Sequence, residues 1–223
     1  MNDYKILFKL TTRGRVKNAM KTIDSIYDNV ASKNFELLIS IDYDDEPSKD
    51  GLAWLMIAQQ NDPYYNFHFR SGLSKNKVDA INRDINDFPF KWDILVNVSD
   101  DQVFTVKGFD NIIREAFDNL DTVVHFPDNH RADLMTMSIM GYDAYKRDNY
   151  IYHPTYEGQF CDNEAQVVAQ KRDIYKFVDK VIFNHNHPNY IGGDRDELYR
   201  KYDALFNKDY SNFTYRQSIN FEL

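Results

Sequence analysis

The stretch at residues 6–15 is Ile6-Leu7-Phe8-Lys9-Leu10-Thr11-Thr12-Arg13-Gly14-Arg15, a short apolar run that leads into a polar cluster. The apolar part is typical of a β-strand that is covered on both faces of its sheet. The same arrangement recurs at Leu37–Ile41, which precedes Asp42-Tyr43-Asp44-Asp45, and at Ile94–Val98, which precedes Ser99-Asp100-Asp101-Gln102. The sequence therefore predicts three buried strands that each end in polar residues.

Helical patterns separate these runs. Apolar residues spaced by three and four predict a helix that begins near Val16, and similar patterns follow near Leu52, Val78 and Phe109. Strand and helix alternate over roughly the first 125 residues, which predicts an α/β fold with a mostly parallel, doubly wound sheet flanked by helices. The remainder predicts an α+β half, with the following elements: strands at Thr122–Phe126, Met135–Met140 and Lys180–Phe183, and helices near Asn163–Arg172 and Asp194–Phe206.

The composition limits the possible classes of protein. The chain has 223 residues, with 27 Lys and Arg against 35 Asp and Glu, so its formal charge is -8. This charge disfavours non-specific binding to a polyanion. The single cysteine, Cys161, excludes an internal disulfide framework and a Cys-based metal cage. No apolar run is long enough to cross a bilayer and no secretion signal begins the chain, so we expect a cytoplasmic protein without membrane insertion.

The polar clusters that follow the strands are the candidate binding site. In open α/β sheets, ligands bind outside the carboxyl ends of the strands. The phosphate-binding patterns GxGxxG and GxxxxGK[ST] are both missing, so an anionic ligand would be neutralised by cationic groups or a metal. Asp100 and Asp101 offer hard oxygen ligands for Mg²⁺ or Mn²⁺, although two aspartates after a strand can equally form a turn or a helix cap.

The order and spacing of Thr11-Thr12-Arg13-Gly14-Arg15, Asp42, Ser74-Lys75-Asn76-Lys77 and Ser99-Asp100-Asp101 resemble the nucleotide-sugar half of the GT-A glycosyltransferases. The family 2-like inverting enzymes are the most similar. The resemblance covers about the first 110 residues well and the rest loosely. It implies one GT-A-like domain over residues 1–223, with a nucleotide-sugar half at 1–110, an acceptor and catalytic half at 111–206, and a C-terminal tail at 207–223 that packs back.

The resemblance also implies roles for residues in the first half. Thr11 and Arg13 would lie beside the nucleoside, Asp42 would contact the nucleobase, and Lys75 would approach the nucleotide. Residues Ser99-Asp100-Asp101 would occupy the Asp-x-Asp motif of the family, with Ser99 replacing the first aspartate. Asp101 then falls on the metal-ligand position, and Asp100 is the alternative.

The same resemblance places a general base near the start of the helix expected at Asn163–Arg172. Inverting transfer needs a carboxylate to accept the proton of the acceptor hydroxyl. Asp162 is our first choice, and Glu164 and Glu157 are alternatives; Asp162 also has the position of a helix N-cap. Tyr150, Tyr152 and Tyr156, close by in the sequence, could form a sugar-stacking wall or belong to the core.

A histidine after the strand expected at Lys180–Phe183 would be the further metal ligand that the resemblance implies. We expect the two imidazoles to point to opposite sides of the chain, so that one of His185 and His187 reaches the metal, with His185 favoured. Oxygen and imidazole ligands together favour Mn²⁺ over Mg²⁺.

These observations predict a metal-dependent glycosyltransferase that moves a sugar from a nucleotide-sugar, preferably a UDP-sugar, to an acceptor hydroxyl with inversion. A glycan, a protein and a hydroxylated nucleobase all remain open as acceptors. Two alternatives also remain open. One is a metal-dependent phosphoesterase or nuclease that uses Asp100, Asp101, His185 and His187, and the other is a non-catalytic module that binds a nucleotide or a sugar.

Overall fold

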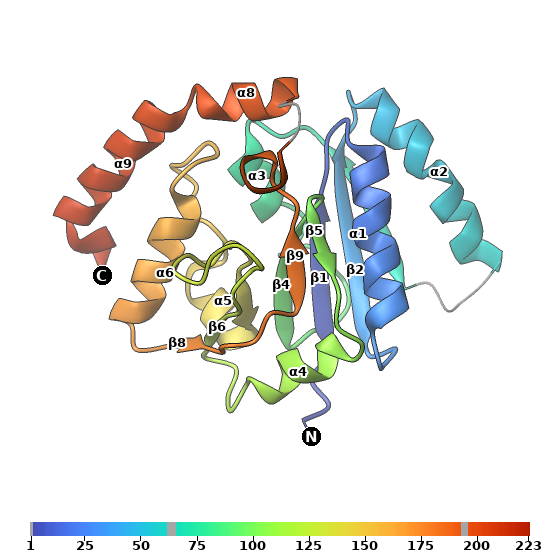
Figure 1. Cartoon of the computed structure of the whole chain (residues 1–223), viewed down its shortest axis with the longest axis horizontal. Helices are drawn as coiled ribbons and strands as arrows, with labels where there is room; N and C mark the ends of the chain where they lie inside the picture. The colour runs from blue at the N-terminus through green and yellow to red at the C-terminus, as the bar shows by residue number, and fades with distance from the viewer. Residues whose placement is uncertain (1, 62–65, 193–195) are drawn as a thin grey trace.

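A computed structural model describes residues 2–61, 66–192 and 196–223 of the chain (Figure 1). A mixed sheet in the strand order β3-β2-β1-β4-β7-β6-β8 forms its centre. The four parallel strands are β1 (Ile6–Thr11), β2 (Phe35–Asp42), β3 (Phe67–Gly72) and β4 (Ile94–Ser99). The sheet continues through β7 (Ile139–Gly141), which is antiparallel to both β4 and β6 (Val123–His125), and ends at β8 (Tyr175–Phe177), which is parallel to β6. The expected α/β class with a mostly parallel sheet is confirmed.

Helices cover both faces of the sheet (Figure 1). One face packs against α1 (Val16–Asn29), α2 (Glu46–Asn61) and α4 (Phe109–Glu115). The other packs against α3 (Lys77–Asn82), α5 (Tyr142–Asp148) and α6 (Cys161–Lys171). Within β1, Ile6 and Phe8 belong to the first core and Leu7 to the second, and all three are completely buried. Alternate side chains of a strand point to opposite faces, so this division explains why the run is apolar throughout.

The register of the parallel strands brings their carboxyl ends to one edge. Thr11 of β1 lies opposite Ser40 of β2 on one side and Ser99 of β4 on the other. The polar clusters that follow these strands therefore start from neighbouring points.

The C-terminal third of the chain folds back over this edge. The short strand β5 (Gln102–Phe104) pairs with β9 (Phe183–His185), which places His185 opposite Gln102. After α7 (Pro188–Ile191), α8 (Glu197–Asp203) crosses above the sheet and α9 (Phe206–Ser218) runs down beside α6 (Figure 1). A 3₁₀ turn at Asn220–Glu222 follows. No helix within the described ranges combines the length and apolar character needed to cross a membrane.

The predicted elements of the first half are confirmed, with shorter helices near Val78 and Phe109 than the apolar patterns suggested. The second half differs more. The strand expected at Lys180–Phe183 is wrong, because β9 begins only at Phe183, and the strand expected at Met135–Met140 begins at Ile139. Residues 194–195 of the helix expected near Asp194–Phe206 lie outside the described residues, and the rest forms α8 and the start of α9.

Candidate active site

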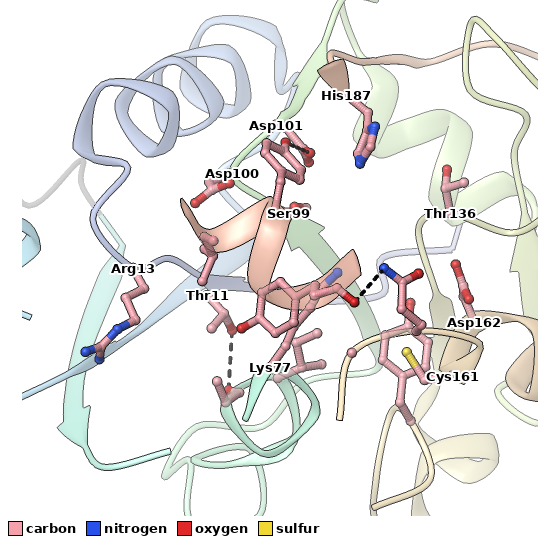
Figure 2. A pocket seen from close by; sticks show the side chains of 18 of the residues that line it. Thr11, Arg13, Lys77, Ser99, Asp100, Asp101, Thr136, Cys161, Asp162 and His187 are labelled. Carbon is pink, nitrogen blue, oxygen red and sulfur yellow. Dashed lines mark hydrogen bonds between the residues drawn. The ribbon is translucent and has the colours of Figure 1, made fainter. Parts of the chain in front are cut away.

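A cleft of about 630 Å³ opens at the carboxyl ends of β1, β2 and β4, between the first turns of α3 and α6 and beneath α8 (Figure 2). Figure 2 shows Thr11, Asp100 and Asp101 on one side of the cleft and Cys161 and Asp162 on the other. The cleft collects most of the residues singled out from the sequence: Thr11, Arg13, Asp42, Lys75, Ser99, Asp100, Asp101, Asp162, His185 and His187. Segments separated by more than 100 residues in the chain thus share one cavity.

Asp42 and Arg13 form the polar wall at the β2 side of the cleft. Nη1 of Arg13 donates to Oδ2 of Asp42 at 2.9 Å, and the same guanidinium makes two hydrogen bonds to Asp44, of 2.6 and 3.0 Å. The other oxygen of Asp42 accepts hydrogen bonds from the backbone N–H and the hydroxyl of Ser74. Both oxygens of Asp42 are therefore held in place. Lys75 follows Ser74 and lines the same wall.

Asp100 is buried beneath the loop that follows β1. Its Oδ2 accepts a hydrogen bond of 2.7 Å from the hydroxyl of Thr12, and Nη1 of Arg15 lies 3.5 Å from its Oδ1. Burial and the neighbouring charge of Asp101 raise the pKa of Asp100 to about 6, against the opposing effect of Arg15 and Thr12. These contacts tie the β4 carboxylates to the β1 loop.

Asp101 faces α8 and β9. Its Oδ2 accepts a hydrogen bond of 2.9 Å from the hydroxyl of Tyr199, while Nε2 of His185 lies 3.5 Å from its Oδ1. Burial raises the pKa of Asp101, but His185, Ser99 and Tyr199 outweigh burial and hold the pKa well below its usual range. Oδ1 of Asp101 is buried and accepts no hydrogen bond from the described residues.

His185 bridges two carboxylates. Its Nδ1 lies 3.1 Å from Oδ2 of Asp128, on the opposite side of the ring from Asp101. Burial lowers the pKa of His185, but the carboxylates of Asp101 and Asp128 outweigh it and raise the pKa to about 9. His187 lines the same cleft, because β9 ends at His185 and the chain turns into α7, which His187 caps through its ring nitrogen. The expectation that the two imidazoles lie on opposite sides is wrong: both line the cleft, and residues two apart in an extended segment point to the same side.

The donor groups fit a divalent cation, although no three His, Cys, Asp or Glu side chains in the described parts of the chain form a ready-made metal site. A buried carboxylate oxygen without a hydrogen-bond donor is costly, and Oδ1 of Asp101 is such an atom. An imidazole lies beside it. Cations of this class take the remainder of their ligands from water and from phosphate oxygens, so two protein ligands suffice.

Asp162 lies in the first turn of α6, half-buried at the wall of the cleft. Its Oδ1 accepts the backbone N–H of Asn163 at 3.0 Å. Burial raises the pKa of Asp162, and Lys77 opposes this effect. The N-cap of α6 is Phe160, so the alternative explanation of Asp162 as the helix cap is wrong.

The two alternative bases lie outside the cleft. Glu164 is buried on the far side of α6, where it accepts hydrogen bonds from Arg216 at 2.8 Å and from Tyr156 at 2.7 Å. Glu157 pairs with Lys208 of α9. Neither carboxylate lines the cleft, because the helical turn directs Glu164 into the contact between α6 and α9.

Sequence reasoning did not place Tyr199 beside Asp101 or Asp128 beside His185. Tyr199 comes from α8, almost 100 residues away, and nothing in its local sequence marks it. Asp128 belongs to the charged loop at residues 128–133 after β6, and nothing in that loop's sequence indicates a contact with His185. Of the tyrosines considered for a sugar-stacking wall or the core, Tyr156 belongs to the core and its hydroxyl bonds to Glu164, whereas Tyr152 is buried but lines the cleft.

No protein-family model matches the chain, and no curated protein matches it in sequence. Solved structures do match. A mannosyltransferase of Pyrobaculum calidifontis, PcManGT, in complex with GDP-Man and Mn²⁺, has a TM-score of 0.68 at 10% identity over 84% of this chain and 58% of its own. S. aureus TarS (residues 1–349) in complex with UDP-GlcNAc has a TM-score of 0.66 at 13% identity over 87% of this chain and 60% of its own. The chain has the GT-A fold.

The chain therefore spans about 60% of the length of those two structures. The fold alone does not decide the reaction, because function resides in the site. A 4-diphosphocytidyl-2C-methyl-D-erythritol synthase from Anaerococcus prevotii matches as well, with a TM-score of 0.54 at 12% identity over 79% of this chain and 87% of its own. The residues in the cleft must therefore carry the functional argument.

Proposed function

We propose that the protein is a metal-dependent glycosyltransferase that moves a sugar from a nucleotide-sugar, preferably a UDP-sugar, to an acceptor hydroxyl with inversion. One observation carries the proposal: the unsatisfied oxygen of Asp101 beside His185 and the half-buried carboxylate of Asp162 line one cleft in a GT-A fold. A cation-binding edge and a proton acceptor in one cavity are what a sugar transfer from a diphosphate requires. We also propose that the protein acts in the cytoplasm, as expected from the sequence.

The donor would lie along the ends of the parallel strands. Arg13 and Asp42, fixed against each other at 2.9 Å, present a rigid polar edge to the nucleobase. Thr11 lies next to the nucleoside and Lys75 reaches the phosphates as a mobile cation. In this proposal residues 1–110 supply the donor site, residues 111–206 supply the acceptor side, and residues 207–223 brace the α6 region.

Asp101 and His185 would hold the cation, with Ser99 orienting Asp101, Asp100 as the alternative carboxylate and His187 as the alternative imidazole. An oxygen and nitrogen donor set favours Mn²⁺ over Mg²⁺. A bound cation would neutralise the negative charge that develops on the leaving diphosphate.

Asp162 would act as the general base. Its carboxylate accepts the proton of the acceptor hydroxyl while the acceptor oxygen bonds to the anomeric carbon. The bond from that carbon to the diphosphate breaks on the opposite face, so the nucleoside diphosphate leaves with the bonding electrons and the configuration inverts. A pKa raised by burial makes Asp162 a stronger proton acceptor than an ordinary aspartate.

The test uses the full chain with UDP-glucose, UDP-galactose, UDP-GlcNAc and GDP-mannose, each with Mn²⁺, Mg²⁺ or EDTA. We expect binding and slow release of free nucleoside diphosphate from at least one donor with Mn²⁺, and loss of both in EDTA. Asp101→Ala should abolish the metal-dependent binding, whereas Asp143→Ala, an acidic residue in the first turn of α5, should not.

Absence of both binding and turnover for every donor would overturn the proposal. Cleavage of bis(p-nitrophenyl) phosphate without any sugar donor would support the phosphoesterase alternative instead.

A further inference from the structure

Three aromatic side chains gather where the wall of the cleft meets α9. Phe160 precedes α6, and Phe206 and Tyr210 lie one turn apart on α9. The rings of Phe206 and Tyr210 are stacked, with centroids 6.2 Å apart and an interplanar angle of 15°. The ring of Phe160 lies 5.0 Å from that of Phe206 and 5.3 Å from that of Tyr210. We call these three residues the aromatic platform.

Two of the three rings of the aromatic platform are exposed in spite of their apolar surface, and the third, that of Phe160, is partly buried. Phe206 is 51% exposed and Tyr210 is 52% exposed. Rings that only filled the core would be covered, as Tyr152 and Tyr156 are. A contiguous group of exposed rings is typical of a binding surface.

The platform adjoins the reaction site. Phe160 and Phe206 line the same cleft as Asp162, and Phe160 precedes Asp162 by two residues. The backbone of Phe160 has φ 59° and ψ -1°, in the left-handed region, which is unfavourable for a bulky side chain. Backbone strain of this kind persists where surrounding contacts fix it, and it gathers at functional sites.

Buried contacts hold α9 in register with the loop that carries Phe160. The carboxylate of Asp209, almost completely buried, accepts the backbone N–H groups of Gly158 at 2.9 Å and Gln159 at 2.8 Å. A side chain at Gly158 would meet the ring of Tyr202 at 2.7 Å, so the loop and the end of α8 approach as closely as a glycine allows. The platform is therefore a fixed surface built by two segments, the loop before α6 and the first turns of α9.

The charges around the platform favour a neutral ligand. Lys208, between the two exposed rings in sequence, is paired with Glu157, and Asp209 is used by the loop. The whole chain carries a formal charge of -8, which disfavours a nucleic acid. Gln159 and Asn163 add amide groups to the same cleft. Flat apolar rings beside amides match a pyranose, which has an apolar C–H face and hydroxyls along its edge.

We propose that the aromatic platform is the acceptor subsite and that it binds a neutral sugar unit of a glycan, with an acceptor hydroxyl directed toward Asp162. This inference rests on the proposed glycosyltransferase function and narrows its acceptor to a carbohydrate. The platform stacks on one face of the sugar, and the cleft amides bond to its edge.

The test measures binding by saturation-transfer-difference NMR, with the aromatic protons of the protein irradiated. The probes are maltohexaose, cellohexaose, chitohexaose, mannohexaose, a hydroxymethylcytosine-containing DNA duplex and a Ser/Thr-rich peptide. We expect transfer to at least one oligosaccharide and to neither of the other two. Phe206→Ala and Tyr210→Ala should each weaken that binding by about tenfold, the size of a lost aromatic stacking contact. Tyr215→Ala, which removes a tyrosine of α9 that is 62% exposed and lies outside the platform, should leave the binding unchanged.

Other outcomes overturn the inference. The inference fails if the protein binds no oligosaccharide or prefers the DNA or the peptide. It also fails if Phe206→Ala and Tyr210→Ala bind the oligosaccharide as tightly as the unsubstituted protein does. Sedimentation showing a dimer that Tyr210→Ala dissociates would assign the platform to a second copy of the chain. Titration of the unsubstituted protein with UDP and GDP in Mn²⁺ separates the two proposals, because nucleotide binding without sugar binding removes only the acceptor inference.

Discussion

The hydroxyl of Tyr199 donates a hydrogen bond of 2.9 Å to Oδ2 of Asp101, so a side chain of α8 occupies one oxygen of the proposed metal ligand. The ring of Tyr199 lies over the guanidinium of Arg15 at 3.9 Å, and Arg15 pairs with Asp196 at the start of α8. These contacts fix α8 above the carboxyl end of β4. The tyrosine hydroxyl on Oδ2 and a cation on Oδ1, the oxygen beside His185, would therefore compete for the negative charge of one carboxylate.

The first prediction follows from this competition. Tyr199→Phe removes the hydrogen bond but keeps the ring over Arg15, so we expect UDP in Mn²⁺ to bind about fivefold more tightly, equivalent to about 1 kcal/mol for one hydrogen bond. Isothermal titration calorimetry measures the change. Tyr215→Phe is the matched control on α9 and should show the affinity of the unsubstituted protein. Weaker binding by Tyr199→Phe would instead mean that the hydroxyl takes part in holding the cation or the nucleotide.

The second prediction separates the two acidic residues of the first turn of α6. Asp162→Asn removes the proton acceptor and should lower the rate of transfer about a thousandfold at an unchanged midpoint of thermal unfolding. Glu164→Gln removes the buried charged partner of Arg216 and leaves it only the exposed carboxylate of Glu222, so it should lower stability by about 3 kcal/mol. Transfer assays at a temperature where both variants are folded, together with calorimetric scans, measure the two effects. A large loss of rate in Glu164→Gln and none in Asp162→Asn would move the base to Glu164.

Three strands of the first half, β1, β2 and β4, were predictable because they are covered on both faces, whereas the partly exposed edge strand β3 was not predicted. In β1, Ile6, Leu7 and Phe8 are all buried, so the run is apolar without interruption and its end is sharp. In the second half the strands shrink to three residues, as in β9 (Phe183–His185). Segments of this length carry no periodicity that distinguishes them from loops.

The residues of the candidate site were predictable where they follow such a strand, as Asp42 and Asp101 do. Tyr199 and Asp128 were not, because tertiary packing alone brings them to Asp101 and His185. The position of Glu164 was also not predictable. The residue at which α6 begins decides which carboxylate of its first turn faces the cleft. That starting point depends on the left-handed backbone at Phe160, which the sequence does not reveal.

The third prediction concerns the pH dependence of transfer. Asp162 acts only when deprotonated, so the rate should rise with pH through its pKa, which burial raises above that of an ordinary aspartate. The charge of Lys77 opposes this rise. Lys77→Met should therefore shift the acidic limb of the profile of kcat against pH to higher pH, whereas Lys77→Arg should keep it in place. An acidic limb that does not move in Lys77→Met would show that another group controls it.

The buried amine of Lys9 gives a prediction about stability. Lys9 lies on the same face of β1 as Leu7, is completely buried, and donates a hydrogen bond to Ser40, whose hydroxyl bonds to Asp84. Burial lowers the pKa of Lys9 from 10.5 to about 7, although the charge of Asp84 opposes this. The unfolded chain keeps the ordinary value, so between these two pH values the unfolded state binds the extra proton.

The fourth prediction is that Lys9 destabilises the fold in full below pH 7 and progressively less as the pH rises toward 10.5. Lys9→Met removes the ammonium, so the variant should gain in free energy of unfolding over the unsubstituted protein at pH 6 and lose that advantage by pH 10. Urea unfolding of both proteins at several pH values measures the difference. Lys5→Met, which removes a partly exposed lysine, is the control and should show a much flatter difference. A difference between Lys9→Met and the unsubstituted protein that stays constant from pH 6 to pH 10 would mean that the Lys9 amine is protonated in the folded state throughout, held by Asp84 against the effect of burial.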